Sequence, residues 1–224
     1  MTTAFATVRS RRHSGFRTAL QQLLRSDRGS VAVELVIIIP VMVLLMVGFS
    51  EIYLYMRTVS ALEHTAFTLA DSLGQTTRLI NTNATTDSND LGSIWNAAAM
   101  LSAPNSLNQG GGVVITSVCE AKSSCAWPAM PPPTMAVGVP QIWWHANAPW
   151  NASGMKTRLT AANILPATWP FRNGDSAIVV EVFYTFNPFA MMTGLWPGAP
   201  GTQTLYERIY VRPRTLQPLT LVSE

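Results

Sequence analysis

Apolar residues dominate the chain from about residue 31 to residue 55, and positions 35–50 carry no charged side chain. About 20 residues at about 1.5 Å per residue cross the hydrocarbon core of a bilayer. The stretch therefore predicts a membrane-spanning helix. The apolar region of a secretory signal would be shorter and would end at small residues, a pattern that Gly48, Phe49 and Ser50 match poorly.

The helical pattern continues past the apolar stretch. Apolar side chains recur there at steps of three and four residues, which is typical of an amphipathic helix; they are Met56, Val59, Leu62, Ala66, Leu69, Ala70 and Leu73. Arg57, Glu63 and His64 fall between them, and Gly74 is a plausible stop. We expect one helix over about 31–73, whose first half is apolar all round and whose second half packs against a domain.

The rest of the chain predicts a small antiparallel sheet. Segment 75–90 is rich in Thr, Asn and Asp and indicates a solvated loop, and 94–101 indicates a short helix. Strands are expected over 113–120, 141–145, 176–186 and 205–212, with turn-rich breaks at 105–112 and 173–175. The fold class is therefore α+β. We divide the chain into a basic leader (1–29), a transmembrane and stem helix (30–74) and an outer domain (75–224).

Charge separates the leader from the rest. Six of the 15 basic residues are arginines that precede Ser30, where Asp27 is the one acid. From Ser30 onward there are nine basic and eleven acidic residues, so that part carries −2. An excess of arginine on one side of a membrane span indicates the cytoplasmic side. This explains the basic leader without nucleic acid, and we expect no nucleic-acid partner.

Cysteines and histidines offer little catalytic chemistry. Cys119 and Cys125 follow the apolar stretch, where an oxidising compartment would favour a disulfide over two free thiols. Beyond the leader the histidines are His64, expected to be exposed on the stem helix, and His145, expected to be packed or capping. Their spacing to the cysteines fits no zinc pattern. We expect no enzyme activity, no catalytic residue, no cofactor and no metal.

Three segments together resemble a known family. The first runs from Arg28 through Gly29, Ser30, Val31, Ala32, Val33 and Glu34 to Leu35, and is followed by Ile39, Pro40 and a Leu/Met/Val run. The second is Glu51-Ile52-Tyr53 at the end of the span, and the third is Asn173-Gly174-Asp175 before a strand that leads to Pro188 and Phe189, where the family more usually has Leu. The chain resembles a TadE-like minor pseudopilin of the tight-adherence (Tad) type IV pilus system.

The resemblance implies a set of sites. Processing by a prepilin peptidase would cut between Gly29 and Ser30 and make Glu34 the fifth residue of the mature chain. A carboxylate in an apolar setting is costly unless it is paired. Glu34 is therefore expected to meet the freed amine of a neighbouring subunit, although a solvated position at the headgroups is the alternative. Pro40 would kink or locally melt the helix during assembly, or have no special purpose.

Partners and location follow from the same resemblance. We expect contacts with other pilins and pseudopilins, with the prepilin peptidase and with an inner-membrane assembly platform. The expected location is the bacterial inner membrane, with one span, a cytoplasmic N-terminus and a periplasmic outer domain, and with possible entry into an extracellular pilus. The alternative function is an uncleaved single-pass envelope scaffold of a secretion or pilus machine.

Overall fold

The computed structural model describes residues 27–121, 125, 135–192, 194, 198–215 and 217–223, and the side chains among them from residue 33 onward. Most of the predicted leader thus lies outside the described residues. The chain forms two compact units, residues 1–50 and 51–224. The first contains the apolar stretch, and the second contains the outer half of the long helix together with the sheet.

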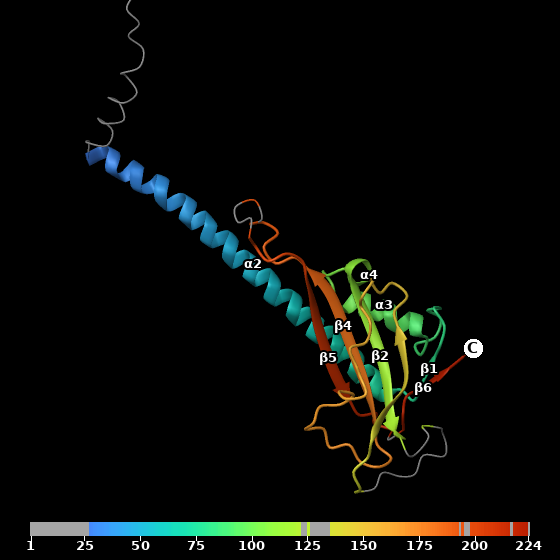
Figure 1. The fold of residues 1–224 in the computed structure, drawn as a ribbon. Helices are drawn as coiled ribbons and strands as arrows, with labels where there is room; N and C mark the ends of the chain where they lie inside the picture. Colours follow the sequence, from blue (N-terminus) through green and yellow to red (C-terminus); the bar gives the residue numbers. More distant parts are fainter. Residues whose placement is uncertain are drawn as a thin grey trace, which may run out of the picture. The chain divides into compact units, whose positions relative to one another are not determined.

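The long helix confirms the main sequence prediction. Helix α2 spans Asp27–Gln75 without interruption at Pro40 (Figure 1). Five of the seven apolar positions predicted to face a domain are buried, namely Leu62, Ala66, Leu69, Ala70 and Leu73. Val59 is half-buried, but Met56 is 65% exposed, so this position was predicted wrongly.

Four antiparallel strands form the main sheet in the order β3-β2-β4-β5. Strand β2 covers Gly111–Glu120, β3 Pro140–Asn147, β4 Ser176–Phe186 and β5 Gln203–Val211. All four predicted strands are present, and the predicted bounds of β4 are those observed. Asn173-Gly174 forms the expected turn into β4, where Gly174 has a φ of +79° that glycine adopts without steric cost.

Both faces of this sheet are covered within the second unit. One face packs on the outer half of α2 and on helix α3, Leu91–Leu101 (Figure 1). The shared core there includes Leu69, Trp95, Ile115 and Val180. The other face is covered by the segment 148–175 between β3 and β4, called the covering segment below. Its side chains, including Met155 and Leu159, pack on residues of β2 and β4. This double cover explains why β2 is buried along its whole length.

Three short elements were not predicted. Strands β1, Arg78–Ile80, and β6, Thr220–Val222, pair in parallel as a separate two-stranded sheet. Segment 75–90 is therefore not entirely a loop, because Leu79 is fully buried. The predicted break at 105–112 contains helix α4, Leu107–Gly110, and the first residues of β2.

Candidate functional site

The apolar part of α2 presents large hydrophobic side chains outward. From Leu35 to Phe49 these side chains are about half exposed or more, with Val36 at 71% and Phe49 at 69%, except that of Val47, which is half-buried. An 18-residue window in this helix reaches a mean hydropathy of 2.6 with only 6% of it buried. Such a helix is long and apolar enough to cross a membrane, and its low burial distinguishes it from a core helix of a soluble protein.

The predicted assembly residues lie at the start of this helix. Gly29 and Ser30 fall within α2, and Glu34 is exposed one residue after the half-buried Val33. Pro40 sits six residues further on inside the helix. Their roles in processing and subunit pairing stay predictions.

The two cysteines lie at disulfide distance. Cys119 is the penultimate residue of β2, and its Cα lies 5.6 Å from that of Cys125, within the usual range for a bridge. Both side chains are buried. The pair lies at the end of β2 and agrees with the disulfide expected from the sequence.

A polar network built on Glu181 occupies the covered outer face of the sheet. Glu181 is a fully buried residue of the central strand β4. Its carboxylate accepts hydrogen bonds from the Thr157 hydroxyl at 2.5 Å, the Arg158 backbone N–H at 3.0 Å and the Tyr206 hydroxyl at 2.6 Å. The Arg208 guanidinium completes the set with an ion pair at 3.3 Å.

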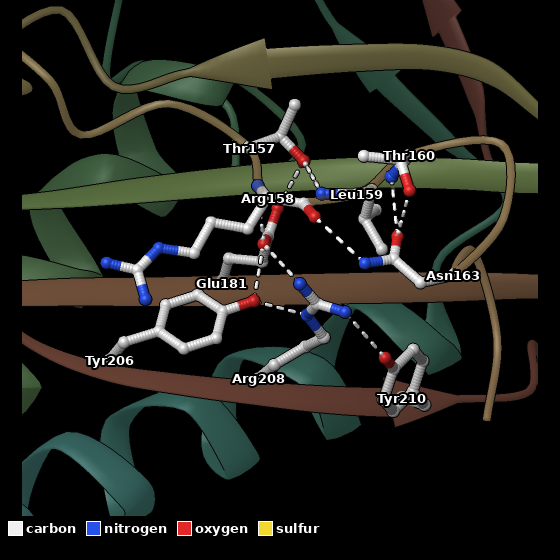
Figure 2. Close-up of polar contacts among 9 residues, drawn as sticks. All are labelled: Thr157, Arg158, Leu159, Thr160, Asn163, Glu181, Tyr206, Arg208 and Tyr210. Carbon is white, nitrogen blue, oxygen red and sulfur yellow. Dashed lines mark hydrogen bonds and ion pairs between the residues drawn. The ribbon is translucent and has the colours of Figure 1, made fainter.

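Figure 2 shows how this network joins the covering segment to two strands. Arg208 also donates to the hydroxyls of Tyr206 and Tyr210, and the Arg158 guanidinium lies 4.4 Å from the centre of the Tyr206 ring. Burial, reinforced by the hydrogen bond to Glu181, raises the pKa of the Tyr206 hydroxyl well above its usual range. Because both carboxylate oxygens of Glu181 accept hydrogen bonds inside the fold, the network anchors the covering segment to the sheet.

A second buried carboxylate is only half satisfied. Glu51, the first residue of the second unit, is 5% exposed. Its Oε1 accepts hydrogen bonds from the backbone N–H groups of Met191 at 2.8 Å and Met192 at 3.1 Å. Its Oε2 is buried and accepts no hydrogen bond from the residues that the structure describes. Sequence reasoning used Glu51 only as a family marker. Its place directly after 16 uncharged residues was the signal that could have singled it out.

In the described part of the chain, His64 and His145 are not brought together with other reactive groups. His64 is exposed on α2 as expected, and His145 on β3 is exposed, so the expectation that it would be packed was wrong. Among the described residues, no group of three or more His, Cys, Asp and Glu side chains could hold a metal ion.

Residues 29–71 match the family described as TadE-like protein. The resemblance drawn from the sequence is confirmed over this segment, which begins at Gly29 and includes Glu34, Pro40 and Glu51. The match suggests an association with the Tad pilus system, and the described residues hold one candidate membrane span. No curated protein and no solved structure gives a significant match.

Proposed function

We propose that this chain is a minor pseudopilin of a Tad-type adhesion pilus, cut after Gly29 by a prepilin peptidase and then used to assemble or prime the pilus. One observation carries the proposal: the TadE-like match begins at Gly29 and runs through the apolar helix that holds Glu34. The resemblance to the family also favours a minor role, because it implies a packed major subunit that is little more than a helix, whereas this chain carries an outer domain.

The proposed chemistry is that of assembly. A glycine before the cut lets the peptidase approach the backbone closely. Cleavage frees the amine of Ser30, four residues before Glu34. In an apolar bundle of stems, a carboxylate that meets a neighbour's ammonium fixes the register of the two helices more than it adds affinity, since desolvation offsets much of the attraction. Such a protein acts by binding neighbouring subunits, and we propose no enzymatic reaction.

Pro40 and the membrane location complete the proposal. A proline inside an apolar helix leaves one carbonyl without its helical donor, which eases local melting when the subunit leaves the bilayer. The partners proposed are other pilins and pseudopilins, the peptidase and the inner-membrane platform. The arginine-rich leader favours an N-terminus in the cytoplasm and an outer domain in the periplasm.

The test uses the full chain in a host that makes the pilus. A Glu34→Ala chain should be trimmed normally but should fail to support piliation, while Glu34→Asp, which keeps the charge, should retain part of it. A Gly29→Leu chain should stay untrimmed. Normal piliation with Glu34→Ala would remove the role of Glu34, and an untrimmed wild-type chain would favour the envelope scaffold instead.

A further inference from the structure

Glu51 stands beside a small cavity in the second unit. The cavity measures about 220 Å³ and is lined by Glu51, Ile52, Tyr55, Pro188, Phe189 and Gln203. Apart from the carboxylate and the Gln203 amide, its walls are aliphatic or aromatic. A buried carboxylate oxygen without a hydrogen bond is costly. The cavity therefore suits a cationic group that can fill this acceptor.

The chemistry of the walls favours a guanidinium. Arginine is more weakly hydrated than an ammonium and stacks well on aromatic rings, here those of Tyr55 and Phe189. The volume admits a side chain rather than a folded segment. The expected occupant is therefore an arginine side chain of another surface. That surface must also pack against Ile52 and Tyr55 at the cavity, which are 52% and 40% exposed.

The chain itself carries a surface of that kind. Tyr53, Met56, Arg57 and Ser60 follow one another at helical spacing on α2 and line a groove of about 550 Å³. Tyr53 and Met56 are 63% and 65% exposed. Arg57 is exposed and forms no ion pair with any residue in the described part of the chain.

The two surfaces lie on different sides of the same helix. At about 100° per residue, the middle of the Tyr53–Met56–Arg57–Ser60 face lies roughly 145° around the axis from the Glu51–Ile52–Tyr55 face. One chain can therefore use both faces at once, each toward a different neighbour. Contacts between unlike surfaces that do not close into a ring give open helical assemblies.

We infer that two copies of this chain dock through these faces, with the Arg57 guanidinium of one copy entering the Glu51 cavity of the next. Parallel stems that pair Glu51 with Arg57, six residues apart, are shifted by about 9 Å along their axes. The exposed Met56 of one copy then lies close to the level of the exposed Ile52 of the other. The contact fills the acceptor at Oε2 and buries apolar surface on both stems.

The test is cysteine cross-linking of full-length chains in membranes. Two differently tagged copies are made together in a bacterial host without a prepilin peptidase, one carrying Ile52→Cys and the other Ser60→Cys. Oxidation should give a mixed dimer, and two Ile52→Cys copies should give far less. Because no cleavage is needed, failure here leaves the processing of Gly29 open, and failure of processing leaves this interface open.

The control for this experiment is the choice of the copy that carries each charge substitution. Glu51→Gln in the Ile52→Cys copy, or Arg57→Gln in the Ser60→Cys copy, should lower the mixed dimer about tenfold, as expected when one partner of a desolvated ion pair is lost. The same substitutions placed in the opposite copies should have little effect, and Arg57→Lys should retain part of the yield. Glutamine at 51 keeps an acceptor for the Met191 and Met192 amides, and Arg57 is exposed, so neither change should unfold the chain.

Three results would overturn the inference. Equal yield from two Ile52→Cys copies would indicate a symmetric contact between like faces. A mixed dimer insensitive to Glu51→Gln and Arg57→Gln would show that the charge pair does not hold the copies together. Absence of any cross-link would exclude the contact between copies. The cation that binds Glu51 would then be a different one, such as the ammonium of a lipid headgroup.

Discussion

Glu181 and Glu51 are both buried carboxylates of the second unit, but their surroundings differ. Glu181 accepts hydrogen bonds on both oxygens, and its ion pair with Arg208 joins two strands. Glu51 is anchored through Oε1, while Oε2 has no hydrogen-bond partner in the described part of the chain and the residue borders a cavity. A buried carboxylate whose two oxygens both accept hydrogen bonds within the chain stabilises the fold. A buried carboxylate with one oxygen left without a hydrogen bond marks a place where a second molecule can donate the missing one.

The largest expected effect comes from breaking the complete network. Glu181→Ala would leave Arg208, Tyr206 and the Arg158 backbone N–H without their acceptor, so unfolding should become easier by about 3–5 kcal/mol, as for one partner removed from a buried ion pair. Denaturant titration of the full chain in detergent, followed by circular dichroism, measures this. Glu181→Gln, which keeps the shape, should cost less. Equal stability of Glu181→Ala and wild type would contradict the structural role.

Alkaline pH should weaken the same region through Tyr206. The pKa of its hydroxyl is raised in the folded state, chiefly by burial and then by Glu181. The stability tied to the protonated hydroxyl is therefore fully present below the unfolded pKa of about 10 and is lost as the pH rises beyond it. Tm measured from pH 8 to 11 should fall more steeply for wild type than for Tyr206→Phe. The exposed Tyr53→Phe is the matched control, and parallel curves for Tyr206→Phe and wild type would count against this account.

The half-satisfied carboxylate should behave differently. Glu51→Gln keeps an oxygen for the amides of Met191 and Met192 and removes a buried charge, so the stability of the isolated chain should change by less than about 1 kcal/mol. The same denaturant titration compares it directly with Glu181→Gln. A loss for Glu51→Gln as large as that for Glu181→Ala would mean that Glu51, too, serves the fold.

A third carboxylate gives the smallest effect. The pKa of Glu207 on β5 is raised by partial burial and by the negative charge of Glu63 on α2. The protonated form is thus favoured in the folded state, so this contribution is present below the unfolded pKa of about 4.5 and is lost as the pH rises through the folded pKa. Glu207→Gln should raise Tm slightly at pH 7 and have no effect near pH 3. A lower Tm at pH 7 would contradict this.

The sequence was sufficient for the long elements and insufficient for the polar contacts. Helix α2 and strand β4 could be predicted because their apolar patterns extend over many residues. Strands β1 and β6 have three residues each, too few for a periodic signal, and they pair across more than 140 positions. The same separation hid the surroundings of Glu51, whose amide donors lie 140 and 141 residues away.

The hydrogen-bond partners of Glu181 could not be predicted from a local sequence pattern either. Thr157 lies 24 residues before it and Arg208 27 residues after it, in a covering segment and a neighbouring strand. In the sequence, Glu181 is one polar residue among Val and Phe. Alternation would place it on a solvated face, but the covering segment buries that face. Only the tertiary structure distinguishes an exposed glutamate on a strand from the centre of a buried network.

The central claim, that this chain is a trimmed subunit and not a permanent envelope scaffold, is tested most directly at its N-terminus. Protein purified from the membranes of its native host is analysed by intact mass and N-terminal sequencing. We predict a chain that begins at Ser30, with a free amine four residues before Glu34. A chain that keeps its arginine-rich leader through Gly29 would contradict the claim.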